Sequence, residues 1–243
     1  METTPTQSLA DKQREIIAKL KPRSNITFSI VYDVHLGCIL SLLCPPITAG
    51  FTENMVITSR SSRTIEGIIP GLIERITKEE GKILFIGNGL SDIPLVASQK
   101  DRVGLELIVV DIFKYQDLTD DLQRFHDALT EQQIPEPLNL RLYLRGATQL
   151  SQAIKTGSLK FVYYCFGSNT IPRSLLDADL VINIVGPSIE TISEQVQLLR
   201  IGGELYISGI STSRLSIEQD LGVNYSVSEI LPKENSYVIR RIR

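Results

Sequence analysis

Strand-like and helix-like segments alternate along most of this chain, and no other feature constrains its fold as strongly. β-Branched or aromatic runs typical of strands occupy residues 82–86, 105–110, 138–144, 161–166, 179–185 and 204–208. Between or beside them, apolar residues recur at helical spacing over residues 92–99, 118–129, 148–154 and 189–199. Strands separated by helices cannot form tight hairpins, so they pair in parallel, with helices covering both faces. The sequence therefore predicts a doubly wound α/β domain.

The end of the chain follows a different pattern. Residues 224–231 and 236–242 resemble two strands, and the four residues between them have turn-like composition. We expect an antiparallel strand pair at the end of the sheet.

The N-terminal part reads as a separate segment. Residues 8–20 form a helical pattern with one apolar stripe, Leu9, Ile16, Ile17 and Leu20. The apolar stretch that follows is compatible with either a helix or a strand. Another helical pattern begins at Ser62. We therefore expect residues 1–60 to be a helical extension or lid, and residues 61–243 to be the main domain.

Charge and cysteine content limit the partners and the compartment. The 25 basic and 28 acidic residues give a net charge of −3, which provides no overall field to attract DNA or RNA. Cys38, Cys44 and Cys165 show no disulfide or zinc spacing, which fits reduced thiols in the cytoplasm. The apolar run at residues 36–47 is too short to cross a bilayer, and the polar N-terminus does not resemble a signal peptide. The oligomeric state stays open.

A glycine-containing turn follows the first central strand, in the segment KILFIGNGLSDIP. Gly87 and Gly89 flank Asn88 there. Glycines at this position let the backbone approach a ligand closely, and the N-terminus of the next helix offers free N–H groups to a polar or anionic moiety. The turn is a candidate nucleotide-type site.

The next strand ends at Asp111, which Ile112 follows, about two dozen residues after the turn. A carboxylate there can accept hydrogen bonds from both hydroxyls of a ribose. Asp111 is therefore the candidate ribose ligand.

Three segments together resemble the class I S-adenosylmethionine-dependent methyltransferases. GNGLS is similar to the first motif of that family, Asp111 matches its ribose-binding acid, and LLRIGGELYIS resembles the late turn that leads into its fifth strand. The resemblance implies a Rossmann-like, seven-stranded, mostly parallel sheet with S-adenosylmethionine as the cofactor. It implies methyl transfer to an acceptor, for which the acidic composition favours a small molecule.

The resemblance also implies where the adenine and the donor methyl lie. Ser168 and Asn169 align with the adenine-contacting stretch, and Asn183 with the end of the fourth strand. Residues 146–150, GATQL, resemble the same adenine motif, so two segments compete for that role.

The sequence departs from the family pattern at two positions. Phe85 stands where the family has an acidic residue, and Ser91 where it has a third glycine. No catalytic base is evident, although His35 could reach the site if the extension forms a lid. A methyltransferase-fold protein that binds without turnover, and an NAD(P)-dependent oxidoreductase, are the alternatives. The second would need a glycine where Asp92 stands.

Overall fold

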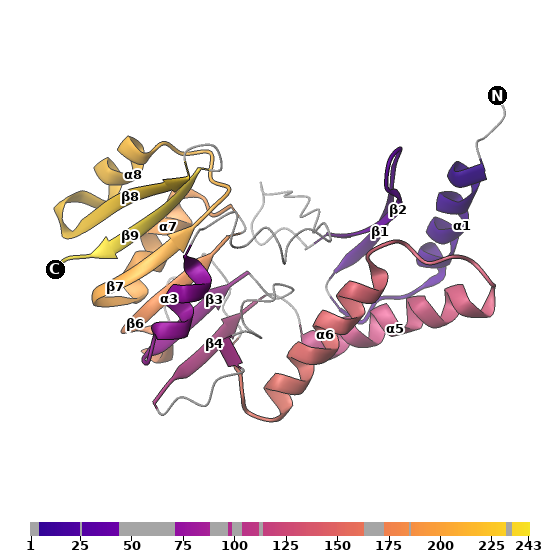
Figure 1. Cartoon of the computed structure of the whole chain (residues 1–243), viewed down its shortest axis with the longest axis horizontal. Coiled ribbons are helices and arrows are strands. Elements are labelled where there is room, and N and C mark those ends of the chain that lie inside the picture. The colour runs from indigo at the N-terminus through magenta and orange to yellow at the C-terminus, as the bar shows by residue number, and fades with distance from the viewer. Residues whose placement is uncertain are drawn as a thin grey trace. The chain divides into compact units, whose positions relative to one another are not determined.

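The computed structural model describes residues 5–24, 26–43, 71–87, 97–98, 104–111, 114–162, 173–184, 186–231 and 235–243 (Figure 1). The helix predicted at residues 92–99 lies almost wholly outside these ranges, as does most of the one predicted from Ser62. The chain forms two compact units. The first consists of residues 1–61 and 112–152, and the second of residues 62–111 and 153–243.

A seven-stranded sheet forms the centre of the second unit, with the strand order β5-β4-β3-β6-β7-β9-β8 (Figure 1). The strands from β5 to β7 run parallel, whereas β9 pairs antiparallel with both β7 and β8. The predicted fold class is thereby confirmed. The bounds are Lys160–Val162 (β5), Glu106–Val110 (β4), Lys82–Ile86 (β3), Ala178–Asn183 (β6), Leu199–Ile207 (β7), Ser236–Arg241 (β9) and Tyr225–Leu231 (β8).

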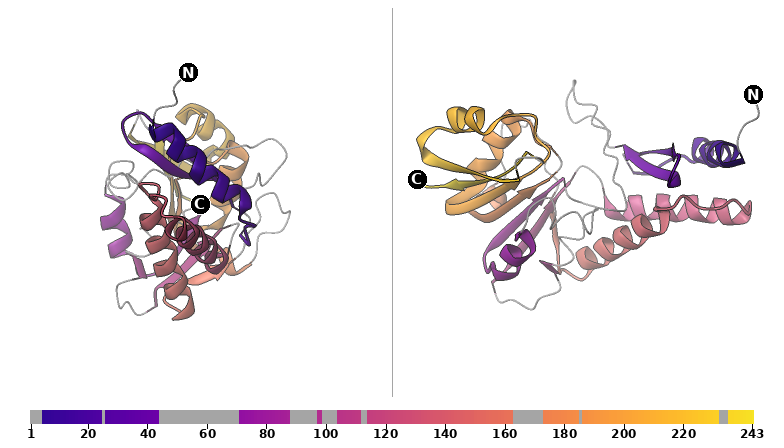
Figure 2. Two further views of the ribbon diagram at one scale, coloured as in Figure 1. Left: turned by 90° about the vertical axis from the view of Figure 1, so that its right-hand side faces the viewer. Right: turned by 45° about the horizontal axis from the view of Figure 1, so that its top comes forward.

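Helices pack on both faces of this sheet, as the alternation predicts (Figures 1 and 2). On one face, α7 (Ile189–Gln195) and α8 (Arg214–Leu221) contribute Ile192 and Ile217 to a buried cluster with the alternate residues of the central strands. On the other face, α3 (Leu72–Lys78) is joined to β7 by an ion pair between Arg75 and Glu204, whose Nε and Oε2 atoms lie 2.9 Å apart. The sequence did not predict α8, because Ile217 is its one buried residue and leaves almost no apolar stripe.

The strand predicted at residues 138–144 is wrong, because these residues belong mainly to the helix α6 (Leu140–Lys155). Leucines alternate there with other residues, which imitates the period of a strand. The buried side chains instead follow helical spacing: Leu140, Tyr143, Ala147 and Leu150. Leu138 and Leu142 are exposed, so burial selects the helical period over the alternating one.

The first unit contains a hairpin and helices. The strands β1 (Thr27–Asp33) and β2 (Gly37–Leu43) form an antiparallel pair, and α1 (Pro5–Lys19), α5 (Tyr115–Glu131) and most of α6 belong to the same unit (Figure 2). The helix predicted at residues 8–20 is confirmed by α1, and the one predicted at residues 118–129 is confirmed by α5. The lid function proposed for residues 1–60 stays a prediction.

Polar contacts between distant residues hold the first unit together. The buried carboxylate of Asp121 accepts hydrogen bonds from the backbone N–H groups of Arg23 and Ser24 and from the Ser24 hydroxyl, at 2.7–3.0 Å. The buried amide of Asn139 pairs with both the N–H and the C=O of Leu40, each at 2.8 Å. These contacts fix the hairpin and its preceding loop to residues almost one hundred positions later in the sequence.

Among the described residues, none of the helices has the length and apolar character needed to span a membrane.

Candidate functional site

The candidate site lies at the carboxyl ends of the central parallel strands of the second unit. The chain passes from β3 outward to β4 and β5, and then returns to the other side of β3 to form β6 and β7. In open α/β sheets, ligands bind in the crevice beyond the carboxyl ends of the strands, where the strand order reverses. Here that reversal falls between β3 and β6.

Gly87 follows β3 directly and adopts a φ of 67°, in the left-handed region that favours glycine. Its N–H donates a hydrogen bond to the carbonyl oxygen of Val110 at 3.0 Å, so the first residue of the turn is still tied to the neighbouring strand. The backbone therefore leaves the sheet in a direction that a residue with a side chain adopts only with strain. Asn88 and Gly89, the rest of the predicted turn, lie outside the described residues.

Asp111 follows β4 directly and is 6% exposed. The register pairs Ile86 with Val110, so the next residues along these strands, Gly87 and Asp111, leave the sheet at the same level. Adjacent strands are about 4.8 Å apart. The structure therefore places side by side the glycine and the carboxylate that the sequence predicted as partners, while Ile112 lies outside the described residues.

Asn183 ends β6, on the other side of β3, and is 1% exposed. Its carbonyl accepts a hydrogen bond from the N–H of Ser208 at 3.3 Å, and the Ser208 carbonyl accepts one from Gly186 at 3.1 Å. The segments after β6 and β7 are thus joined by backbone hydrogen bonds beside the strand-order reversal. Gly87, Asp111 and Asn183 come from three adjacent strands and share one edge.

Sequence reasoning missed a pair of buried hydroxyls at this edge. Ser208 Oγ lies 2.8 Å from Ser236 Oγ, and both side chains are buried. Ser236 begins β9, which runs antiparallel to β7, and this direction brings its first residue to the carboxyl end of β7. No local pattern could have found the pair, because serine is common at strand ends and the two residues are 28 positions apart.

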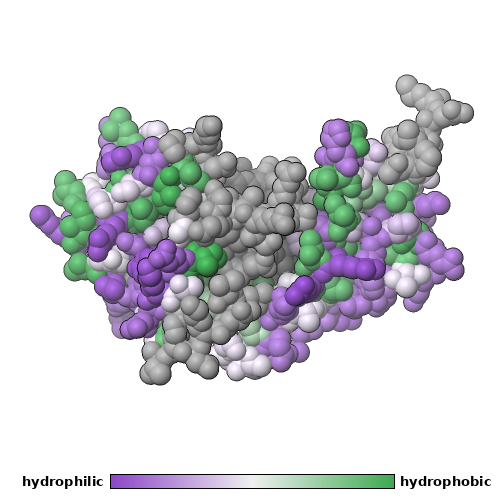
Figure 3. Space-filling view, in the orientation of Figure 1, coloured by the Kyte–Doolittle hydropathy of each residue, from purple (hydrophilic) through white to green (hydrophobic). Residues whose placement is uncertain are grey.

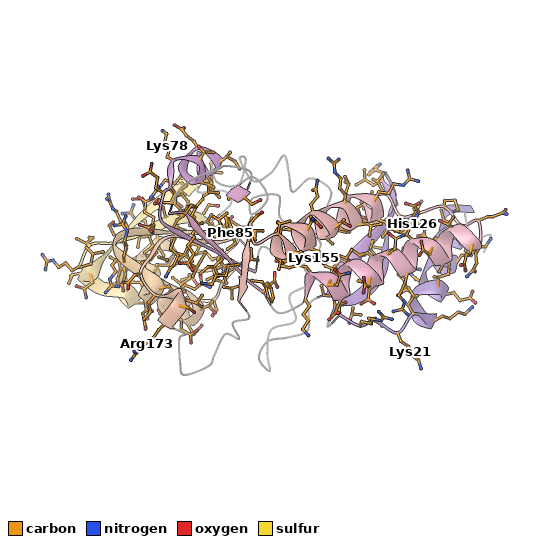
Figure 4. All side chains as sticks on the ribbon, turned by 90° about the horizontal axis from the view of Figure 1, so that it is seen from below. Lys21, Lys78, Phe85, His126, Lys155 and Arg173 are labelled. Atoms are coloured by element: carbon orange, nitrogen blue, oxygen red, sulfur yellow. The ribbon has the colours of Figure 1, made fainter. Side chains whose placement is uncertain are left out.

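Phe85 occupies the position where the family resemblance expects an acid. It is fully buried, and Figure 4 places it among the packed side chains of the sheet. Its aromatic ring offers no charge to the amino group of a methionine moiety. Ser91 and Asp92, the other two positions discussed for this loop, lie outside the described residues.

The two candidate adenine segments have different outcomes. Ser168 and Asn169 lie outside the described residues. Residues 146–150, the competing segment, form the middle of α6, where Ala147 and Leu150 are buried. A helical segment with this burial is not the loop that an adenine contact at a strand end requires.

The histidines belong to the first unit. His35 lies in the exposed turn between β1 and β2, where its backbone N–H donates to Asp33 at 2.8 Å. His126 is half-buried on α5, and its Nδ1 lies 3.1 Å from Glu136 Oε1 (Figure 4). Within the described ranges, no group of His, Cys, Asp and Glu side chains has the arrangement of a metal site.

Comparison with known proteins gives matches to solved structures alone. No protein-family model matches the chain, and no curated protein matches it. A ribosomal protein L11 methylase from Lactobacillus delbrueckii subsp. bulgaricus is 14% identical, with 81% of this chain and 89% of that chain covered and a TM-score of 0.43. A SAM-dependent methyltransferase from Aquifex aeolicus is 13% identical, with 74% and 92% covered and a TM-score of 0.39. A spermidine synthase from Thermotoga maritima is 14% identical, with 89% and 69% covered and a TM-score of 0.45.

Proposed function

We propose that this protein binds S-adenosylmethionine at the carboxyl edge of its central sheet and transfers the methyl group to a small-molecule acceptor. The observation that carries the proposal is that Gly87 and Asp111 lie at the same level at the ends of two adjacent strands, beside the strand-order reversal. A bare backbone turn and a buried carboxylate at this place suit an adenosyl group, whose ribose hydroxyls need an acceptor and whose bulk needs an approach without side chains.

The residues present fit the nucleoside part of this cofactor. In the proposal, Gly87, Asn88 and Gly89 line the methionine and ribose, Asp111 accepts from the ribose hydroxyls, and Ile112, Ser168 and Asn169 surround the adenine. Asn183, at the end of β6 on the other side of β3, lies near the reacting methyl group in this proposal. Because Phe85 replaces the usual acid, the amino group of the methionine needs a partner elsewhere, and we expect weaker binding than an acidic residue would give.

When bound, the sulfonium of this cofactor supplies an already activated methyl group, so the protein has mainly to position the acceptor. The hydrogen bonds that join the segments after β6 and β7 hold one wall of the edge in place. Asn183 and Ser208 belong to that wall, and both are buried. A nucleophilic nitrogen, oxygen or carbon of the acceptor would attack in line from that side.

Binding measurements test the cofactor assignment. Isothermal titration calorimetry with S-adenosylmethionine and with NAD should give heat for the first ligand alone. Gly87→Ala should abolish that heat, whereas Gly157→Ala should retain it. Gly157 has a φ of 75°, and a Cβ added to it would meet nothing within 4 Å, so its substitution matches the backbone strain of Gly87→Ala away from the carboxyl ends of the strands.

The Asp111→Asn variant tests the ribose contact separately. It should weaken S-adenosylmethionine binding by more than about tenfold, because the amide offers one acceptor oxygen in place of two. Asp127→Asn, at an exposed position on α5, is the matched control. No binding at millimolar cofactor, or equal binding by Asp111→Asn, would contradict the proposal. NAD binding would favour the oxidoreductase alternative.

Turnover and the acceptor class need a separate experiment. The protein is incubated with cofactor labelled in the methyl group and with a cell extract divided into low-mass and macromolecular fractions. Label in the low-mass fraction supports a small-molecule acceptor, and label in RNA or protein contradicts that part. Cofactor binding without any labelled product points to a binding protein that lacks turnover.

A further inference from the structure

The strand β8 lies at one end of the seven-stranded sheet, beyond β9 (Figure 1). Three of its residues, Ser226, Ser228 and Glu229, are exposed. Among the described residues, those of β8 make backbone hydrogen bonds only within the ladder with β9. The opposite side of β8 is therefore a free edge of the sheet.

The ladder with β9 shows which backbone groups face this free edge. Its register sets Asn224 opposite Ile242, and the Ile242 N–H donates to the Asn224 carbonyl at 2.8 Å, so this is a hydrogen-bonded pair. Hydrogen-bonded and non-hydrogen-bonded pairs alternate along an antiparallel ladder. Tyr225, Val227 and Glu229 therefore direct their N–H and C=O groups outward, away from β9.

The free edge has few of the features that usually prevent pairing with another strand, which are lysine, proline and bulges. Residues 225–229 contain neither lysine nor proline. The register shift of β8 comes only between Glu229 and Leu231. Figure 3 shows hydrophobic surface among hydrophilic residues at this end of the second unit, on the left. The edge formed by residues 225–229 is thus regular and open to a further strand.

The residue order of this edge suits a second copy of the same strand. Antiparallel pairing about a twofold axis at Val227 sets Val227 opposite its own copy, Ser226 opposite Ser228, and Tyr225 opposite Glu229. All the outward-directed residues then form hydrogen-bonded pairs, and no like charges meet. An axis at Ser226 would leave Glu229 unpaired, and an axis at Ser228 would leave Tyr225 unpaired, so Val227 is the favoured centre.

The same pairing covers an exposed apolar side chain. Val223 precedes β8 and is 83% exposed. Val223 and Leu231 are equally far from Val227 along the chain, so Val223 of one copy comes beside the end of β8 in the other, where Ile230 and Leu231 are half-buried. Contact between these residues removes apolar surface from water and adds to the backbone hydrogen bonds.

We propose that β8 is a homodimerisation edge, at which two copies of the chain pair their β8 strands antiparallel about Val227 and join their sheets. The occupant is a second copy because each residue of the regular edge then meets a compatible residue of the same strand. The inference does not depend on the proposed methyl transfer.

Sedimentation velocity of the full chain over about 1–100 µM tests the proposal, a range that brackets micromolar association. The unmodified chain should form a dimer. Ser226→Lys combined with Ser228→Lys should weaken dimerisation by more than about tenfold, because each lysine faces a lysine of the other copy. The matched control combines Ser226→Lys with Ser228→Glu. It sets lysine opposite glutamate at both contacts and should keep the dimer.

A mixture of oppositely charged chains identifies the register. Ser226→Glu combined with Ser228→Glu should weaken dimerisation as the two lysines do. An equimolar mixture of this variant with the two-lysine variant should dimerise, because every lysine then faces a glutamate. Circular dichroism of each variant checks that the fold is kept.

A proline variant tests the backbone contact separately. Glu229→Pro removes one outward N–H and leaves the ladder with β9 intact, so it should weaken the dimer, whereas Glu229→Ala keeps the N–H and should not. A monomeric unmodified chain overturns the proposal. So does a two-lysine variant that dimerises as tightly as its lysine–glutamate control, a charge mixture that stays monomeric, or a Glu229→Pro chain that dimerises like Glu229→Ala.

Discussion

Substitution of Gly81 should destabilise the sheet that carries the candidate site. Gly81 precedes β3, and a Cβ built on it would lie 1.8 Å from Oδ2 and 2.3 Å from Cγ of Asp179. That carboxylate accepts a hydrogen bond from the Lys82 N–H at 2.6 Å and pairs with Arg200. Gly81→Ala therefore forces the carboxylate out of both contacts, at the point where β3 and β6 begin.

The expected cost follows from the contacts that are lost. A hydrogen bond to a charged group contributes about 1.5–3 kcal/mol. The ion pair adds less than about 1 kcal/mol, because the Arg200 side chain is 50% exposed. We expect Gly81→Ala to lower the free energy of unfolding by about 3 kcal/mol, and Tm by about 6–12 °C for a chain of this size.

Thermal and urea unfolding followed by circular dichroism measures this effect, since the chain has no tryptophan to report by fluorescence. Gly146→Ala is the matched control, because its added Cβ would meet nothing within 4 Å in the middle of α6. It should stabilise the protein by about 0.5–1 kcal/mol.

The double variant isolates the steric clash with Asp179. On an Asp179→Ala background, the same change at Gly81 should cost less than about 1 kcal/mol, because the clashing atoms are gone. An equal cost on both backgrounds would refute the reasoning.

Further predictions concern single contacts. Asp121→Ala should cost about 3 kcal/mol in urea unfolding, because buried N–H and O–H donors lose their acceptor, whereas Asp120→Ala, at a 36% exposed side chain, should cost less than about 0.5 kcal/mol. Asn139→Ala should cost about 2–3 kcal/mol in the same assay, because it leaves both backbone groups of Leu40 unpaired, and a change under about 0.5 kcal/mol would contradict it. Burial, and secondarily the charge of Glu204, raises the pKa of Tyr206 to about 12. The neutral phenol therefore stabilises the folded state fully below the ordinary value of about 10, and this contribution is lost as pH rises toward 12. Tyr206→Phe should flatten the alkaline fall in stability, and an unchanged tyrosinate absorbance titration of the folded protein would contradict this.

The local pattern of the sequence was sufficient to predict the position of the central strands β3 and β4. The run at residues 82–86 predicts β3 with its observed bounds, and the run at 105–110 predicts β4 to within one residue. Such runs are informative because strands buried on both faces need continuous apolar residues whatever their neighbours are. Gly87 and Asp111 could be predicted for the same reason, since each directly follows such a run.

Local pattern failed where two periods fit the same residues or where partners are distant. Leu138–Leu144 satisfies a strand period and a helical period, and packing of Leu140 and Tyr143 selected the helix. The hairpin of β1 and β2 was ambiguous because its stabilising contacts, to Asp121 and Asn139, lie almost one hundred residues away.

The sequence by itself determined the doubly wound sheet, its antiparallel end, and the positions of a glycine and a carboxylate directly after two neighbouring strands, because each depends on the spacing of neighbouring residues. The tertiary structure alone decided that β9 lies between β7 and β8, that Ser236 thereby meets Ser208, and that residues 112–152 group with the N-terminal segment. These features depend on which surfaces are buried together, and burial brings together residues that no local period connects.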